Sequence, residues 1–154
     1  MSYSKFLFIG LGGSGGATLG HIQNSLKDWL KENQEKWRPE AEWDDPIELP
    51  QGWQFLHIDT PPSPDCTPSV SSDEYLGLIQ PGVTYPHIAH ALRGNNILHK
   101  DLATWLVSPV DFAGQALEKG AGQFRAIGKA LGLHGLQKIH ERIQKIHTKL
   151  TDIE

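Results

Sequence analysis

Two short apolar runs along the chain have the length and flanking residues of β-strands. Phe6 to Ile9 contains no polar residue and ends at glycine, and Trp53 to Asp59 is halted by the proline-rich segment TPPSPDCTPS. Short apolar runs bounded by glycine or proline are typical of strands, because neither residue continues a sheet readily. The pattern therefore predicts two strands, the first of them buried.

Two other stretches carry apolar residues at helical spacing. The first runs from about Gly15 to Pro39, and the second from Phe124 to Leu150, with Gly128, Gly132 and Gly135 in its first half. Apolar residues three, four and seven positions apart share one face of a helix, and a helix ends before a proline. The apolar face of the first stretch comprises Leu19, Ile22, Leu26, Trp29, Leu30 and Trp37. We expect two long amphipathic helices, and we expect Trp29, Trp37 and Trp105 to fill the core.

The order strand, glycine turn, helix, strand predicts the fold class. It favours an α/β fold, a Rossmann-like parallel sheet with flanking helices, in a single domain spanning residues 1–154. Two stretches, 39–52 and 60–82, are rich in proline and polar residues and are expected to be loops. Short helices are expected near Ile88 to Arg93 and Leu102 to Val107.

The composition of the chain disfavours nucleic-acid binding and membrane insertion. The net charge of −4 offers no basic field for nucleic acid, and no apolar stretch reaches the roughly 18 residues of a membrane helix. Cys66 is the only cysteine, which excludes an internal disulfide. These features favour a cytoplasmic protein with no nucleic-acid or membrane partner.

Five glycines occur within the seven residues from Gly10 to Gly16, directly after the first predicted strand. A glycine-rich turn between a strand and a helix lets backbone N–H groups approach an anion, and the start of the helix adds partial positive charge. A tight turn without a ligand would explain one or two glycines. Five of them favour a phosphate-binding site.

The identity of the phosphate ligand is less constrained. Gly10, Gly12 and Gly15 satisfy the spacing of the dinucleotide fingerprint, but Asp59, at the end of the next strand, lies 44 residues after Gly15. That fingerprint places its acidic residue about 20 positions on. No lysine follows these glycines as a P-loop requires. NAD, FAD or ATP therefore remain alternatives, as does a fold that binds no nucleotide.

A second glycine segment, Lys119 to Gly122, opens into the last predicted helix. It is either an ordinary helix start or a second contact for the far end of a polyphosphate. His87 and His90 are spaced to share a helix face, but no cysteine or carboxylate follows at the spacing of a zinc site, so no metal site is predicted.

Three segments in order resemble the tubulin and FtsZ superfamily. FIGLGGSGG is similar to the glycine loop after the first strand of that family, and FLHIDT to its second strand. GAGQFRAIGKAL is similar to the GAGxNPExGRKAA segment of the bacterial division tubulins. The chain is thus similar to the N-terminal half of a bacterial tubulin-like GTP-binding protein.

The resemblance implies a ligand, GTP or GDP with or without Mg²⁺, and a set of contacts. The amides of Gly12 to Gly16 would hold the α- and β-phosphates, and Asp59 and Thr60 would lie beside the nucleotide or its metal. Gly120 to Gln123 would face the γ-phosphate, with Arg125 one turn into the helix. The residues implied are Gly10, Gly12, Gly13, Ser14, Gly15, Gly16, Asp59, Thr60, Gly120, Ala121, Gly122, Gln123 and Arg125.

The family signature GGGTGTG, which wraps the phosphates, has no counterpart in this chain. The resemblance therefore implies a GTP-binding module with no catalytic residue of its own, a GTPase only within a longer or assembled protein. It also implies a cytoskeletal role through self-association into filaments or oligomers, or association with the missing C-terminal half. An incomplete sheet would expose an edge strand.

Overall fold

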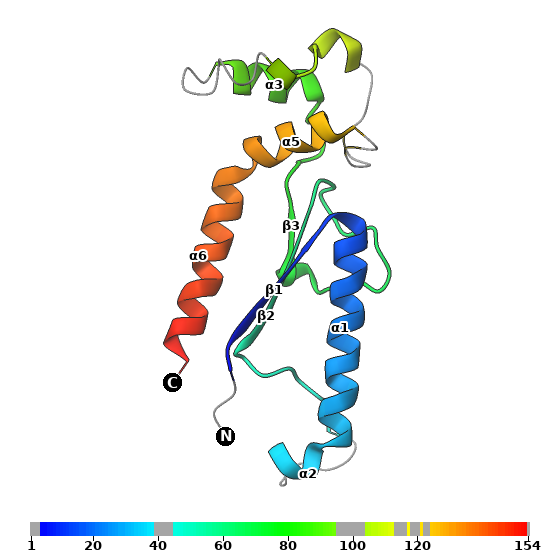
Figure 1. Cartoon of the computed structure of the whole chain (residues 1–154), viewed down its shortest axis with the longest axis vertical. Coiled ribbons are helices and arrows are strands. Elements are labelled where there is room, and N and C mark those ends of the chain that lie inside the picture. The colour runs from blue at the N-terminus through cyan, green and yellow to red at the C-terminus, as the bar shows by residue number, and fades with distance from the viewer. Residues whose placement is uncertain are drawn as a thin grey trace.

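The computed structural model describes residues 4–38, 45–94, 104–112, 117, 121 and 124–153 of the chain (Figure 1). The glycine turn, both predicted strands and, apart from Pro39, both long helical stretches fall within these ranges. The elements are, in order, β1 (Phe6–Leu11), α1 (Gly12–Glu32), α2 (Gln34–Trp37), β2 (Trp53–Asp59), the 3₁₀ turn η1 (Ser72–Glu74), β3 (Tyr75–Gly77), α3 (Tyr85–Arg93), the 3₁₀ turn η2 (Pro109–Phe112), α5 (Arg125–His134) and α6 (Leu136–Asp152).

The three strands form one parallel sheet in the order β1-β2-β3. β1 and β2 pair along their lengths, with Phe6 opposite Trp53 and Leu11 opposite Ile58. β3 pairs only with the last three residues of β2, beginning opposite His57. The parallel sheet and its flanking helices confirm the predicted Rossmann-like α/β fold.

Helices cover the two faces of this sheet separately. Leu19 of α1 packs in a cluster with Phe55, and Ile146 of α6 packs in a second cluster with Leu56. Adjacent residues of a strand point to opposite faces, so Phe55 and Leu56 assign α1 and α6 to opposite sides. Figure 1 shows the carboxyl ends of the strands and the start of α1 at one end of this layered unit, and the two chain ends at the other.

β1 lies at the edge of the sheet, and the prediction that it is buried is wrong. Phe6 is 48% exposed, Ile9 46% and Leu11 69%. Among the described strands β1 pairs with β2 alone, so its other edge is open. Free edges of natural sheets are usually protected by charge, proline or a bulge, and the sequence FLFIGL has neither charge nor proline.

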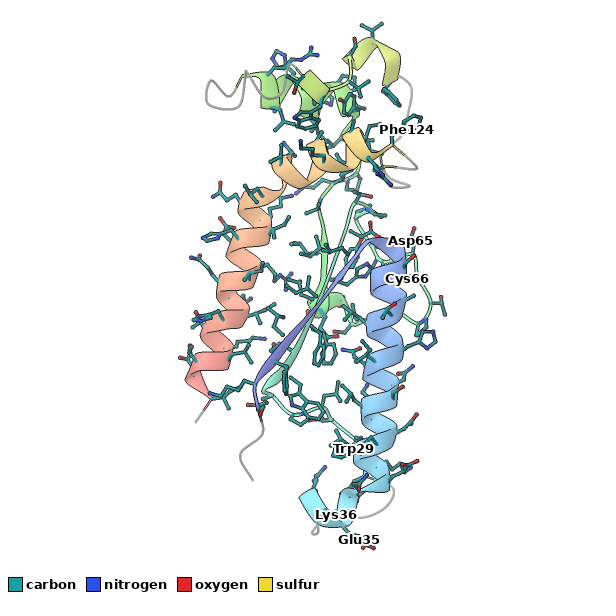
Figure 2. All side chains as sticks on the ribbon, viewed as in Figure 1. Trp29, Glu35, Lys36, Asp65, Cys66 and Phe124 are labelled. Atoms are coloured by element: carbon teal, nitrogen blue, oxygen red, sulfur yellow. The ribbon has the colours of Figure 1, made fainter. Side chains whose placement is uncertain are left out.

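The first predicted helix begins earlier and ends earlier than the pattern indicated. α1 starts at Gly12, immediately after β1, and ends before Asn33, whose side-chain Nδ2 and backbone N–H both donate to the Trp29 carbonyl. Trp29 is 51% exposed, so the expectation that it fills the core is wrong (Figure 2). The Trp37 side chain lies outside the described part of the structure.

The last predicted helix is two helices, α5 and α6, separated at Gly135. A Cβ added to Gly135 would lie 2.8 Å from Cδ2 of Leu78, the residue directly after β3. This close approach explains why glycine stands where the helix axis changes direction in Figure 1.

The middle of the chain holds one strand that the pattern did not predict. β3 has three residues, too few for a periodic signal, and it is joined to β2 by a further hydrogen bond from Leu78 N–H to the Asp59 carbonyl. α3 confirms the expected helix at Ile88 to Arg93. Of the helix expected at Leu102 to Val107, Thr104 and Trp105 are helical, Leu106 and Val107 are not, and residues 102–103 lie outside the described ranges.

A third apolar cluster lies beyond the carboxyl ends of the strands. Ile88 of α3 packs there with Ile127 and Leu131 of α5. Trp105 packs against this cluster as expected, with the Lys129 ammonium 4.1 Å from its ring centre. None of the described helices is long and apolar enough to cross a membrane.

Candidate functional site

The glycine turn joins β1 to α1 without an intervening loop. Gly12, the first residue of α1, has a φ of +69°, a conformation that favours glycine, and a Cβ there would meet nothing within 4 Å. Leu11 precedes the helix without a side-chain cap, and the first turn contains no acidic residue. The first N–H groups of a helix lack partners within the helix, so this start is chemically suited to an anion.

The other glycines of the turn are explained by packing. A Cβ on Gly10 would lie 2.5 Å from the Gly15 carbonyl oxygen, and a Cβ on Gly16 would overlap the His57 ring. Gly13, in contrast, has only one neighbour at ordinary contact distance, Asp65 Oδ1 at 3.9 Å. The structure thus separates glycines that let the backbone pack closely from Gly12 and Gly13, which leave the helix start open.

Asp59 ends β2 on the face covered by α1, and Thr60 follows it directly. Asp59 Oδ1 accepts a hydrogen bond of 2.7 Å from the Thr60 N–H, while Asp59 Oδ2 lies 3.7 Å from Nε2 of His57. The same Nε2 lies 3.0 Å from the carbonyl oxygen of Gly12. The structure therefore brings two of the three predicted segments together, the glycine turn and the end of β2, through His57.

Two further residues beside this turn were missed at the sequence level. Asp65 and Cys66 lie next to the start of α1 in Figure 2. Nothing in the pattern around Asp65 marks it, because it stands in a proline-rich loop that only the fold brings back to Gly13. His57 did carry a signal, since it is a polar residue between the apolar residues Leu56 and Ile58 of a strand.

The pKa of Tyr75, the first residue of β3, depends on its burial and on nearby carboxylates. Its hydroxyl donates a 2.6 Å hydrogen bond to the Pro61 carbonyl. Burial raises the pKa of Tyr75 well above its ordinary value, and the negative charges of Asp59 and Asp65 raise it further. Two carboxylates close enough to act on one phenol indicate a negative potential beside the glycine turn.

The raised pKa of Tyr75 predicts a loss of stability in alkali. The unfolded chain releases this proton near pH 10 and the folded chain keeps it, so the contribution is complete below pH 10 and declines as the pH rises further. We expect the free energy of unfolding, obtained from urea denaturation, to fall between pH 10 and 11, by at most about 1.4 kcal/mol per pH unit for this group.

The control for this prediction is a comparison of two phenylalanine variants. Tyr75→Phe should lower stability at pH 8, because the bond to Pro61 is lost, and should flatten the alkaline decline. Burial also raises the pKa of Tyr85, whose hydroxyl donates to the Val107 carbonyl. Tyr85→Phe removes only this second contribution and should leave that of Tyr75 in place. Equal alkaline slopes in wild type and Tyr75→Phe would contradict the assignment.

The third predicted segment is described only in part. Gly120, Gly122 and Gln123 lie outside the described residues. Ala121 lies near Gly128, and its carbonyl accepts a 3.4 Å hydrogen bond from the N–H of Phe124. Arg125 is the exposed first residue of α5, so the expectation that it lies one turn into the helix is wrong. Figure 1 shows α5 beyond the carboxyl ends of the strands, at the end of the sheet where α1 starts.

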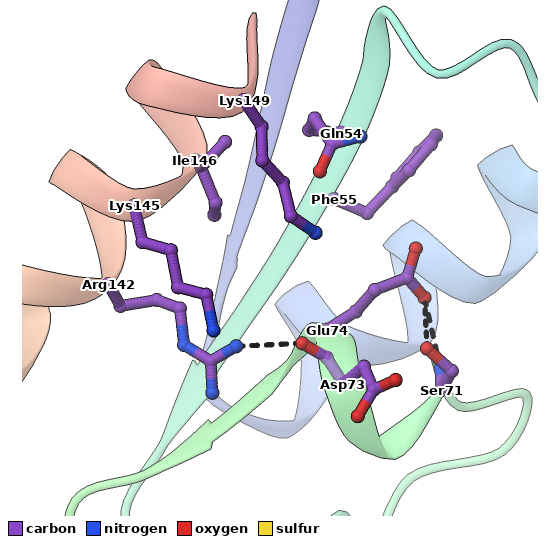
Figure 3. A pocket seen from close by; sticks show the side chains of 9 residues that line it. All are labelled: Gln54, Phe55, Ser71, Asp73, Glu74, Arg142, Lys145, Ile146 and Lys149. Carbon is purple, nitrogen blue, oxygen red and sulfur yellow. Dashed lines mark hydrogen bonds between the residues drawn. The ribbon is translucent and has the colours of Figure 1, made fainter.

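A separate pocket of about 440 Å³ lies between α6 and the beginning of β3 (Figure 3). Arg142 of α6 donates to the carbonyl oxygens of Asp73 and Tyr75, at 2.8 and 3.4 Å. Glu74 accepts hydrogen bonds from Gln23 of α1 and from Ser71. These contacts tie the start of β3 to both flanking helices, and no predicted site residue lines the pocket. Its lining comprises Gln54, Phe55, Ser71, Asp73, Glu74, Arg142, Lys145, Ile146 and Lys149.

The two histidines considered as metal ligands are exposed on α3. His87 Nδ1 lies 3.1 Å from the Thr84 hydroxyl. In the described ranges, no three His, Cys, Asp or Glu side chains gather as a metal site would require.

A family model described as tubulin-like matches residues 7–154, which is nearly the whole chain. No curated protein and no solved structure matches the sequence.

Proposed function

This chain belongs to the tubulin-like family, and on that premise we propose that it is a GTP- or GDP-binding module. The observation that carries the proposal is the open, uncapped start of α1 at Gly12 and Gly13, directly after β1. A polyphosphate placed there would accept hydrogen bonds from the backbone N–H groups and would lie at the positive end of the helix dipole. Within Gly12 to Gly16, the amides at the start of the segment would hold the phosphates, because later N–H groups bond carbonyls inside the helix.

Asp59 and Asp65 bear on the form in which the nucleotide binds. Both carboxylates lie beside the turn, and their charge opposes that of a polyphosphate. A divalent cation between phosphate and carboxylate would remove this repulsion, and Mg²⁺ is commonly held by one or two carboxylates together with phosphate oxygens. We therefore propose Mg²⁺ as the companion of the nucleotide, with Asp59 and Thr60 on its side of the site.

The far end of the nucleotide would extend toward α5. Arg125 begins that helix, and a guanidinium is well suited to phosphate oxygens. The segment Gly120 to Gln123 precedes it and would face the γ-phosphate. The signature GGGTGTG has no counterpart in this chain, so GTP hydrolysis is proposed only for a longer or assembled form of the protein.

The partner that we propose is a strand beside β1. Leu7, Ile9 and Leu11 direct their backbone groups away from β2, because Phe6 N–H points inward to the Gly52 carbonyl and alternate residues reverse direction. The side chains of Ile9 and Leu11 are also exposed. A second copy of the chain, or the C-terminal half that the resemblance implies, would cover this edge.

The experiment that tests the proposed function is nucleotide identification followed by titration. The purified protein is denatured and the released nucleotide identified, and the stripped protein is then titrated with GTP, GDP, ATP and NAD, with and without Mg²⁺. We expect guanine nucleotides to bind more tightly than the others, and Mg²⁺ to strengthen the binding. Binding of NAD or ATP in preference would favour a Rossmann-type enzyme, and no binding at all would favour a partner subunit without nucleotide.

The same samples test the proposed partner edge. Light scattering coupled to size exclusion should show dimers or larger species of the isolated chain. A monomer at high protein concentration would count against self-association through β1.

A further inference from the structure

His57 is the most completely enclosed polar residue at the glycine turn. It lies on β2, the central strand of the sheet, and its side chain is 0% exposed. Gly16 has no side chain, and the imidazole occupies the space where a Cβ of that residue would stand. The ring of Tyr75 meets the imidazole edge-on, with the ring centres 5.0 Å apart. The imidazole is therefore held in one position between α1 and β3.

The hydrogen bond to Gly12 determines which ring nitrogen carries the proton. A carbonyl oxygen can only accept, so Nε2 of His57 donates to Gly12 at 3.0 Å. In the neutral ring Nδ1 is then a bare acceptor, and it is buried without a hydrogen-bond partner among the described residues. Burying an unpaired acceptor costs at least as much as one neutral hydrogen bond contributes. Stability alone would favour an apolar residue here, so the imidazole needs another reason.

That reason lies in what the Nε2–H group holds. Gly12 is the first residue of α1 and has a positive φ, so its conformation sets the direction of the N–H groups that follow. Leu11 provides no side-chain cap. The bond from His57 is thus a side-chain link from β2 to the first carbonyl of the helix, in addition to the chain connection through Leu11. Asp59 Oδ2 lies 3.7 Å from the same nitrogen, so one side chain locates both the turn and the end of β2.

We propose that His57 is a positioning residue that fixes the glycine turn in its anion-binding conformation and sets its spacing from Asp59. The inference rests on the proposed nucleotide binding and extends it to a residue that does not touch the nucleotide. Its Nε2–H group is the part that acts, so a side chain that keeps a donor at this place should keep the function.

The test compares His57→Gln, which retains a donor at the position of Nε2, with His57→Leu, which fills similar space without one. The first readout is amide hydrogen exchange of residues 16–18, whose N–H groups bond the carbonyls of the first helical turn, with residues 26–30 of α1 as the internal reference. The second readout is the Kd for GTP with Mg²⁺. We expect exchange at 16–18 to be about tenfold faster in His57→Leu and the Kd to rise about tenfold, with His57→Gln restoring most of both.

The outcomes are distinguishable. Unchanged exchange at residues 16–18 in His57→Leu overturns the inference, whatever the nucleotide does, and so does faster exchange with an unaltered Kd. If His57→Leu does not fold, the inference stands or falls on His57→Gln, which must match wild type in both readouts. If wild-type protein binds no GTP, the proposed function fails, and the exchange result alone still decides whether His57 holds the turn.

Discussion

Replacement of Gly16 by alanine is expected to destabilise the chain by about 3 kcal/mol, the upper part of the range for overpacked cores. The new Cβ would overlap three atoms of the His57 ring. That ring has no room to retreat, because Gly12 and Tyr75 hold its other sides. The free energy of unfolding from urea denaturation, followed by tryptophan fluorescence, measures the effect.

Two comparisons show whether the imidazole is the cause. Gly13→Ala makes the same change three positions earlier, where the nearest atom is Asp65 Oδ1 at 3.9 Å, and it should alter stability by less than about 0.5 kcal/mol. In a His57→Ala background, adding Gly16→Ala should cost less than about 1 kcal/mol, because the clash is gone. An equal cost of Gly16→Ala with and without the imidazole would show that the backbone, not the ring, rejects the methyl group.

Replacement of Gly13 by aspartate is expected to weaken GTP binding about 100-fold, equivalent to about 2.7 kcal/mol. The new carboxylate would stand where we propose the phosphates, and it would join Asp65 in repelling them. Stability should change little, because the favourable effect of a negative charge in the first turn of a helix, about 0.3–1 kcal/mol, is opposed by repulsion from Asp65. Titration with GTP and the urea midpoint, measured on the same preparation, separate the two effects.

Gly13→Asn is the matched variant, since it has nearly the same shape and no charge. Gly13→Asn should lose much less affinity for GTP than Gly13→Asp. The difference between the two variants should shrink as the salt concentration rises, because salt screens the added charge. Equal losses in the two variants would show that bulk rather than charge is responsible. Wild-type affinity in Gly13→Asp would place the phosphates elsewhere.

Local pattern was sufficient for the elements that are long or strongly marked. The strands at Phe6 and Trp53, the glycine turn and the helix after it follow from apolar runs, helical spacing and glycine content. α3 was also expected at its place. These features depend on neighbours within a few positions along the chain, and one sequence contains that information.

Features that depend on distant segments could not be read in the same way. β3 is recognised only by its pairing with β2, and the lack of space for a side chain at Gly135, between α5 and α6, comes from Leu78. Burial of β1 was predicted from its apolar residues, yet they lie at an edge, because burial depends on which segment lies alongside.

The same distinction between local and distant information applies to the candidate site. The sequence by itself determined that a glycine-rich turn follows a strand and opens a helix, and that an aspartate and a threonine end the next strand. Only the tertiary structure decided that Gly10, Gly15 and Gly16 serve close packing, that Gly12 and Gly13 leave the helix start open, and that His57 connects this start to Asp59. The physical reason is that the positions of the glycines are visible in the sequence, whereas the atoms that pack against each glycine are determined by the fold.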